Sequence, residues 1–248
     1  MQTANLHPPG VRKLIAEARG LGRRALAENA SKQILSRYGL AVPRSAVIRS
    51  VEEIEPALGS LNAPFVLKLI SPDLVHKSEA GGVRTNLANG AAVRDAMKGM
   101  RDQAASRRLG IDGYLLEETA PSGQEVVIGG VIDASFGPLV MFGLGGIFVE
   151  ILQDVSYRIC PITVLDAKEM IHELRAAPVL SGARGRAPAS ETLLIVALMA
   201  IGGPGGLLLD LADEIAEVDI NPLIVSSSAI VAVDARLILA EGPAHETR

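Results

Sequence analysis

The first half of the chain mixes helical and strand periodicity. Apolar side chains recur every four residues from Leu26 to Tyr38, which predicts a helix that begins near Arg24. Gly39 and Pro43 are the stop signals expected after such a helix. Similar patterns predict three strands and two more helices in this half: strands at 45–50, 64–70 and 83–87, and helices at 51–60 and 91–106.

The second half begins with short apolar runs separated by turn residues. Strands are expected at 114–118, 125–133 and 138–144, and their short connections predict an antiparallel meander. Later apolar stripes predict two helices, and the chain closes with two strands around a serine-rich turn. These elements are expected at 166–175, 190–200, 216–225 and 229–239.

This order of elements predicts an α+β fold with two lobes. Pro8, Pro9 and Gly10 interrupt the beginning of the chain, so the first residues are expected to form a leader. We expect a leader, two α+β lobes with a cleft between them, and a tail, at 1–21, 22–112, 113–241 and 242–248.

Composition narrows the class of protein. Of 248 residues, 48% are hydrophobic and 21% are charged, which is the balance of a globular protein with real cores. The net charge is −4, with no tryptophan and no long basic run, so nucleic acid is not an expected partner. The single cysteine excludes an intrachain disulfide framework. The N-terminus lacks the apolar core of a signal peptide, and apolar runs such as 193–201 are too short to span a bilayer. We therefore expect a cytoplasmic protein that does not associate with membranes.

Lys68 is an anomaly in the predicted strand at 64–70. Its neighbours on both sides are strongly apolar, so its ammonium group should be largely buried. A buried ammonium group needs an anion to offset its desolvation. Either Lys68 snorkels to water at the edge of a lobe, or it faces the cleft and binds phosphate.

His76 lies in the polar stretch "SPDLVHKSEAGGV" that follows this strand. A loop histidine is most often simply solvated. Here, however, Gly81 and Gly82 leave backbone N–H groups open to an anion, and Lys77 and Arg84 add positive charge. The alternative is therefore a reactive imidazole beside a phosphate site.

Oxygen-bearing side chains gather near the C-terminus, in "VDINP" and "AVDAR". Asp219 and Asn221 are two residues apart in a predicted strand and should share one face, and Asp234 lies on the next strand. Oxygen ligands on rigid strands suit Mg²⁺. A turn aspartate plus a buried aspartate paired with Arg236 explains the spacing equally well.

Glutamates mark the junction between the lobes. Glu117 and Glu118 end one predicted strand, and Glu125 begins the next. Such carboxylates could accept hydrogen bonds from the ribose of a nucleotide, although solvated charges at strand ends are an equal explanation. The glycine-rich "GLGGI" at 143–147 lacks the Lys-Ser/Thr pair of a P-loop.

Taken together, five stretches of the chain resemble one family. These are "LSRYGLAVP", "FVLKLISPDLVHKSEAGGV", "GQEVVIGGVIDASFGPLVMFGLGGIFVE", "SGARGR" and "EVDINPL…AVDAR". The chain resembles the ATP-grasp domain, or beta subunit, of the ADP-forming acyl-CoA synthetases, relatives of succinyl-CoA synthetase, from about residue 25 to 240. The resemblance implies an ATP-grasp fold with ATP or ADP and Mg²⁺ between two lobes.

The resemblance also implies roles for individual residues. His76 would carry phosphate transiently between a phosphohistidine on a partner subunit and ADP. The nucleotide would be held by a set of side chains and loop amides: Lys68 on phosphate, the amides of Gly81 and Gly82, Glu118 at the adenine-side hinge and Glu125 on the ribose. The metal would be held by Asn221 and Asp234, with Asp219 adjacent.

The family reaction is acid + CoA + ATP ⇌ acyl-CoA + ADP + phosphate. In this family a CoA-binding alpha chain, or a fused domain, carries the second histidine and selects the acid and CoA. The sequence shows no such domain, so we expect an enzyme subunit that works in a hetero-oligomer. The alternatives are a non-catalytic regulatory ATP-grasp module and a stand-alone carboxylate–amine or carboxylate–thiol ligase, which leaves His76 without a role. The acid and the choice between ATP and GTP are not encoded in any pattern recognised here.

Overall fold

The computed structural model describes residues 8, 10–72, 81–146, 149, 152–182 and 187–241. These residues form two compact units. The small unit is Pro43–Ala120, and the large unit combines Met1–Val42 with Pro121–Arg248. Both units contain helices and antiparallel sheets, which confirms the predicted α+β class.

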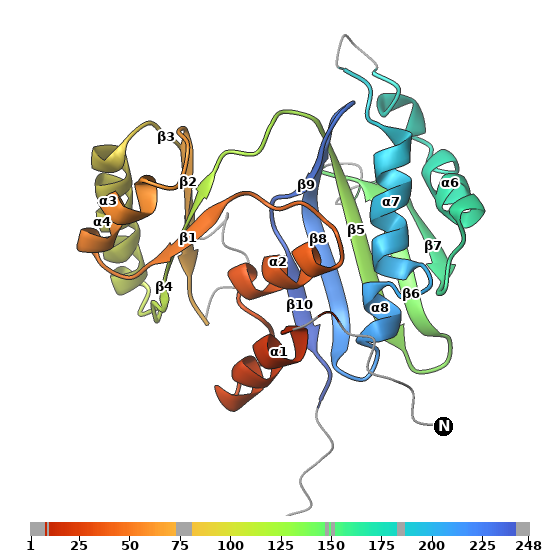
Figure 1. The fold of residues 1–248 in the computed structure, drawn as a ribbon, viewed down its shortest axis with the longest axis horizontal. Helices are drawn as coiled ribbons and strands as arrows, with labels where there is room; N and C mark the ends of the chain where they lie inside the picture. Colours follow the sequence, from red (N-terminus) through yellow and green to blue (C-terminus); the bar gives the residue numbers. More distant parts are fainter. Residues whose placement is uncertain are drawn as a thin grey trace, which may run out of the picture. The chain divides into compact units, whose positions relative to one another are not determined.

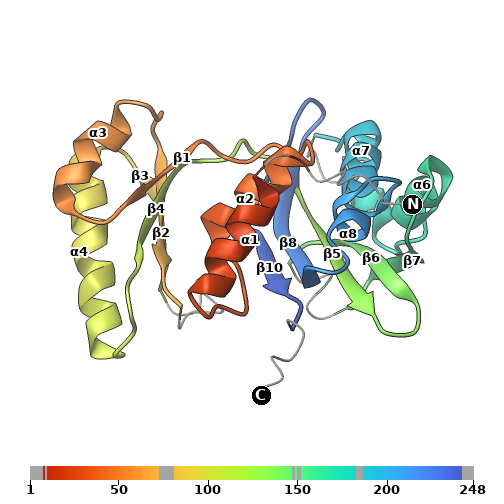
Figure 2. The same cartoon turned by 60° about the horizontal axis from the view of Figure 1, so that its bottom comes forward.

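The small unit is a four-stranded antiparallel sheet with helices packed on one face. The strands lie in the order β1 (Ser45–Ile48), β4 (Gly113–Glu118), β2 (Phe65–Ile70) and β3 (Val83–Leu87). The helical elements are η1 (Val51–Glu53), α3 (Ile54–Leu58) and α4 (Gly90–Ser106), and α4 runs along the sheet (Figure 2). Its core joins Leu67 and Leu116 of the sheet to Val93 and Met97 of α4.

The large unit is built on a six-stranded antiparallel sheet. The strand order is β10 (Arg236–Leu239), β8 (Ile215–Val225), β5 (Gln124–Asp133), β6 (Gly137–Leu144) and β7 (Val155–Ile159), with β9 (Ile230–Ala232) also paired to β8. The helical elements are α1 (Val11–Gly20), α2 (Glu28–Arg37), α6 (Val164–His172), η2 (Ala177–Val179), α7 (Glu191–Gly202) and α8 (Leu207–Asp210).

Strand alternation divides the sheet of the large unit into two different faces. The even-numbered residues of β5, such as Val126 and Ile128, are buried in one core with Leu198 of α7 and Leu208 of α8. The helices α7 and α8 lie against β5 and β6 on this face (Figure 1). Ile34 of α2 belongs to the same core. The odd-numbered residues of β5 therefore point to the opposite face, which we call the open face.

Two of the predicted boundaries differ from the structure. The predicted leader contains α1, whose Val11, Ile15 and Ala18 are buried in the core of the large unit. The predicted lobe boundary between residues 112 and 113 separates β4 from its sheet, but β4 pairs with β1 and β2 and belongs to the small unit. The expected meander therefore begins only at β5, because β4 and β5 lie in different sheets.

The segment Glu191–Asp210 is apolar and long enough to meet a composition test for a membrane span, with a mean hydropathy of 2.1 and half of it buried. It contains both α7 and α8. Leu194, Ala197, Leu198 and Ile201 are fully buried against the sheet. The buried residues of this segment belong to the core of the large unit, so its apolar composition is explained by packing against the sheet.

Candidate nucleotide site

Lys68 is buried in β2 and forms an ion pair with Glu117 of β4. The Lys68 Nζ atom lies 3.0 Å from Oε2 of Glu117, and the two side chains are 5% and 1% exposed. Lys68 lies directly opposite Leu115, and Glu117 lies opposite Val66, so both project from the same face of the sheet. Lys68 is therefore buried with an anionic partner, rather than snorkelling to water as one prediction held.

Glu117 and Glu118 point to opposite faces of β4. Glu118 shares its face with Leu116, which packs against the helices of the small unit. Its Oε1 atom accepts hydrogen bonds from both the backbone and the side-chain amide of Asn62, each at 2.9 Å, and lies 3.5 Å from Arg44. The structure therefore brings Glu117, and not Glu118, together with Lys68. The sequence groups Glu117 with Glu118 and Glu125 as candidate ribose acceptors, but its pairing with Lys68 follows only from the register of β2 against β4.

The loop that carries His76 leaves β2 and returns to β3. His76 itself lies outside the residues that the structure describes. The return is anchored: the Leu69 N–H donates to the Gly82 carbonyl at 2.8 Å, and Arg84 donates to the Gly81 carbonyl at 2.7 Å. The Arg84 guanidinium group also reaches Oε1 of Gln103 on α4 at 3.2 Å. Gly81 has a φ of +72°, a left-handed conformation that favours glycine.

Acidic side chains lie on the open face of the large unit. Asp219 of β8 lies opposite Gly129 of β5 on one side and Arg236 of β10 on the other. The pKa of Asp219 is raised first by burial and then by the nearby charges of Glu217 and Asp234, while Arg236 lowers it. The charged form of this carboxylate is therefore disfavoured in the protein alone, and a bound cation would reverse this.

Asn221 and Asp234 are neighbours through the backbone. The Asn221 N–H donates to the Asp234 carbonyl oxygen at 3.2 Å. The pairing of β5 with β8 shifts register between Val126 and Ile128, which places one additional residue in β8 beside Asn221. The predicted strict alternation of Asp219 and Asn221 is therefore interrupted.

The donor set fits a magnesium ion that is shared with a substrate. No group of three or more His, Cys, Asp and Glu side chains is arranged to hold a metal among the residues that the structure describes. Mg²⁺ binds proteins through one or two carboxylates and completes its shell with water and phosphate oxygens. Asn221, Asp234 and Asp219 supply oxygen donors of this kind, so they could hold Mg²⁺ together with a nucleotide.

Glu125 stands on the open face at the beginning of β5. It is exposed, and its carbonyl accepts a hydrogen bond of 2.8 Å from the Gly145 N–H, at the start of the glycine-rich segment after β6. A Cβ atom on Gly145 would lie 3.0–3.2 Å from Glu125 atoms, so glycine is needed for this close approach. Glu125 and Asp219 therefore share one face of one sheet, because Gly129, the β5 partner of Asp219, is four residues beyond Glu125.

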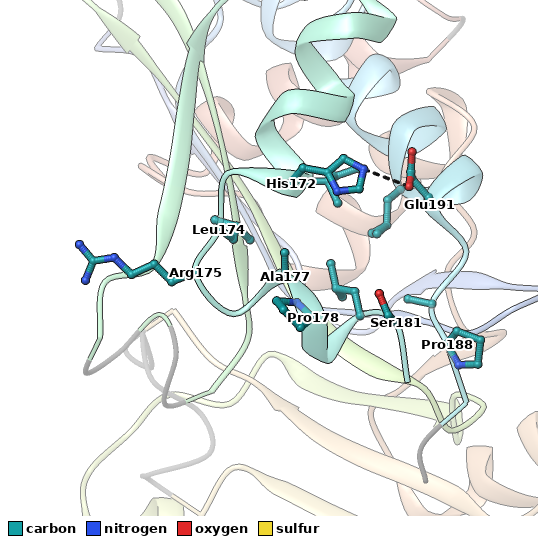
Figure 3. Close-up of a pocket in the computed structure, with 12 residues that line it drawn as sticks. His172, Leu174, Arg175, Ala177, Pro178, Ser181, Pro188 and Glu191 are labelled. Atoms are coloured by element: carbon teal, nitrogen blue, oxygen red, sulfur yellow. Dashed lines mark ion pairs between the residues drawn. The ribbon is translucent and has the colours of Figure 1, made fainter. Parts of the chain in front are cut away.

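A separate pocket of the large unit contains none of the predicted site residues. It has a volume of about 690 Å³ and lies between the end of α6, η2 and the beginning of α7. His172 and Glu191 form an ion pair of 3.2 Å at its edge, and Arg175 points away from it (Figure 3).

The family model of the ATP-grasp domain matches residues 17–239. This is most of the chain. The chain is an ATP-grasp protein. It is 43% identical over 91% of its length to the beta subunit of ADP-forming acetate–CoA ligase I from Pyrococcus furiosus, of which it covers 99%. It therefore belongs to the family of these beta subunits. A single-chain acetate–CoA ligase from Archaeoglobus fulgidus is 36% identical over 84% of this ATP-grasp chain, which spans 30% of that longer protein.

Solved structures of related synthetases have the same fold. The dinucleotide-forming acetyl-coenzyme A synthetase 1 of Ca. Korarchaeum cryptofilum, in complex with coenzyme A and Ca-AMPCP, matches 92% of this chain with a TM-score of 0.84 and 38% identity, over 99% of its own chain. Another structure of that synthetase holds Mg-AMPPCP and a phosphohistidine segment that points towards the nucleotide-binding site, with a TM-score of 0.78. These likenesses confirm the ATP-grasp fold that the motifs indicated.

Proposed function

We propose that this chain is the nucleotide-binding beta subunit of an ADP-forming acid–CoA ligase, and that it relays phosphate through His76. The observation that carries the proposal is the likeness along almost the whole length of the Pyrococcus furiosus beta subunit. The related Korarchaeum synthetase supports the relay, because its phosphohistidine segment was captured pointing towards the nucleotide.

The chemistry of the proposed relay is balanced without a further reactant. A ring nitrogen of His76 attacks the phosphorus atom held by the partner's phosphohistidine, so one N–P bond forms as another breaks. A terminal oxygen of ADP then attacks the same phosphorus atom, and the imidazole of His76 leaves. A magnesium ion, when bound, would offset the negative charge of the phosphates.

Residues of each unit would contribute to nucleotide binding. In the small unit, Lys68 would face the phosphates as a point charge that Glu117 keeps in place. Gly81 and Gly82 would offer backbone amides at the end of the His76 loop. In the large unit, the carboxylate of Glu125 would accept a hydrogen bond from a ribose hydroxyl.

Metal binding is proposed for the open face of the large unit. Asn221 and Asp234 would hold Mg²⁺, with Asp219 beside them. The raised pKa of Asp219 supports this role, because burial and like charges disfavour its carboxylate until a cation arrives.

A second chain would complete the enzyme. Two relatives that this chain matches over nearly their full length are named as beta subunits, whereas the Archaeoglobus ligase carries the corresponding domain within a chain about three times as long. The partner would bind CoA and the acid, and would hand phosphate to His76. Named relatives act on acetate and, in a protein from Nitrosopumilus maritimus, on 4-hydroxybutyrate, and we assign the choice between such acids to the partner.

The test is ATP synthesis by this chain with its alpha chain, ADP, Mg²⁺, phosphate and acetyl-CoA. His76→Ala should lower the rate by at least about a thousandfold, because the phosphoryl carrier is lost. His172→Ala is the matched control, since this histidine is exposed on α6, and its rate should stay within about twofold. Wild-type protein that binds ADP tightly but forms neither ATP nor an acid-labile phosphoprotein would instead be a regulatory nucleotide-binding module, and the proposal would be wrong.

A further inference from the structure

Exposed apolar side chains of the large unit gather at one end of β5, β6 and β7. Val131 is 42% exposed, Phe136 63%, Tyr157 58% and Ile159 54%. The partly buried Leu139 lies among them on β6. Large apolar side chains at this exposure are normal when they are single, but a group of them marks an interaction site.

Strand register makes these side chains neighbours. Val131 pairs with Leu139, and Leu139 pairs with Ile159, so the three lie side by side across three strands. One step along, Met141 pairs with Tyr157. We call the surface made by these residues and Phe136 the strand-end patch: Val131, Phe136, Leu139, Met141, Tyr157 and Ile159.

Phe136 is held at the tip of the β5–β6 hairpin by an aspartate. The Oδ1 atom of Asp133 accepts hydrogen bonds from the N–H groups of Ser135 at 2.7 Å and Phe136 at 2.9 Å. These hydrogen bonds also lower the pKa of Asp133, the Phe136 N–H first. An exposed aromatic ring on a turn that is fixed in this way loses little entropy on binding, which is typical of an interface anchor.

The strand residues of the strand-end patch lie on the open face, on the same side of the sheet as Glu125 and Asp219, and Phe136 is in the turn between β5 and β6. Along β5, Glu125, Gly129 and Val131 project from this face, and Asp219 pairs with Gly129. At about 3.3 Å per residue, Val131 lies roughly 20 Å beyond Glu125 and about 7 Å beyond the Asp219 pair. If Glu125 holds ribose and Asp219 lies beside the metal, the patch lies beyond the phosphate end of the nucleotide.

The size of the patch suits a protein partner. An aromatic side chain buries about 150–250 Å² when it is covered, so Phe136 and Tyr157 alone offer some 200 Å² at their observed exposure. With the aliphatic side chains the patch reaches several hundred Å², which matches the largest patches on monomeric proteins and a substantial part of the roughly 800 Å² that each partner buries in a standard interface.

We propose that the strand-end patch docks the CoA-binding partner chain, with Phe136 as its anchor. This inference rests on the proposed function, because the partner must bring phosphate to the phosphate end of the nucleotide. A partner seated on the patch would approach from that end, and Asp133 would act as a positioning residue for Phe136.

The test compares the affinity of the partner chain for variants of this chain by calorimetry. The triple variant Phe136→Ser, Tyr157→Thr, Ile159→Thr should raise the dissociation constant at least thirtyfold, as expected for two or three central anchors. Asp133→Ala should weaken binding by about threefold to tenfold, because it frees the Phe136 turn. Val196→Thr is the control, because this valine of α7 is also 54% exposed but lies on the helix-covered side of the sheet. It should change the constant by less than twofold.

Two outcomes would overturn the docking proposal. The first is a dissociation constant that stays unchanged in the triple variant while its thermal unfolding midpoint is also unchanged. The single variant Phe136→Ser repeats this measurement with a substitution confined to an exposed turn. The other is self-association of the wild-type chain that the triple variant abolishes, because a second copy would then occupy the patch. The affinity is measured without turnover, so the relay through His76 can fail while docking stands, and the reverse.

Discussion

Lys68 and Glu117 form a 3.0 Å ion pair inside the sheet of the small unit, where at most 5% of either side chain is exposed. Two ions are expensive to bury, and removing one of them leaves the other charged in a poor solvent. The same lysine is the proposed phosphate ligand. The pair therefore serves two purposes: it makes burial of Lys68 tolerable, and it keeps an ammonium group in a fixed place for a ligand.

Lys68→Met should destabilise the protein by about 3–5 kcal/mol, and Glu117→Gln should do so by a comparable amount, because each removes the 3.0 Å counter-ion of a buried charge. The double variant should lose less than the sum of the two. Urea denaturation followed by circular dichroism measures all three, and strict additivity of the two losses would contradict a direct pairing.

Glu118→Gln should leave nucleotide affinity within about twofold of wild type, because its carboxylate binds Asn62 and lies on the opposite face of β4 from Lys68. Glu117→Gln should weaken ADP binding at least tenfold, because Lys68 loses its counter-charge and its position. Calorimetric titration with Mg-ADP separates the two. A larger loss for Glu118→Gln than for Glu117→Gln would contradict this expectation and support the adenine-hinge role that the resemblance implies for Glu118.

Asp219→Asn should stabilise the nucleotide-free protein at neutral pH and weaken its binding of Mg-ADP. The folded state raises the pKa of Asp219 above its unfolded value, so its contribution to stability is present in acid and is lost as the pH rises through the folded pKa. Where the carboxylate is charged, burial and the nearby charges of Glu217 and Asp234 impose a cost that asparagine avoids.

Thermal unfolding of wild type and Asp219→Asn at pH 7, with and without Mg-ADP, checks this prediction. The variant should have the higher midpoint without ligand and the smaller ligand-induced increase. A variant that is less stable than wild type without ligand would show that the Arg236 attraction outweighs burial and repulsion at this site.

Arg84→Ala should loosen the return of the His76 loop to β3. The arginine donates to the carbonyls of Gly81 and Val83 and to the side chain of Gln103. Its loss should cost about 1–3 kcal/mol, since these hydrogen bonds involve a charged donor. Urea denaturation gives the cost, and Arg101→Ala, at an exposed position of α4, provides the comparison.

Much of the fold follows from local patterns. The helical stripe at 91–106 and the alternation in β5 are strong, and the structure has both elements within a residue or two of the predicted bounds. The helix α1 is not predicted, because Pro8, Pro9 and Gly10 indicate an irregular segment just before the helical spacing of Val11, Ile15 and Ala18. Assignment of β4 to its unit failed for another reason, because strand partners are set by long-range pairing that local sequence does not contain.

The candidate site likewise has features that the sequence predicts and features that depend on long-range strand pairing. Burial of Lys68 and its need for an anion follow from its neighbours alone, but the identity of that anion requires the register of β2 against β4. The pairing of Asp219 with Gly129 and Arg236 also depends on register. The bulge beside Asn221 has no local signal except the proline that follows it. The arrangement of His76 lies outside the described residues, so its role rests on the family and on the experiment.

The hydrogen bond between Leu69 and Gly82 limits how far the backbone of His76 can lie from β2 and β3. It ties both ends of the loop to adjacent strands, and His76 is six residues from Ile70 and six from Gly82. A fully extended chain spans at most about 3.5 Å per residue, so whatever path the loop takes, the histidine backbone stays within roughly 20 Å of its tethers. If His76 carries phosphate as proposed, the group that donates the phosphate and the ADP that receives it must both lie within this backbone radius plus the length of the histidine side chain. The length of the segment between Ile70 and Gly82 would then limit the distance between the phosphate donor and ADP in the assembled enzyme.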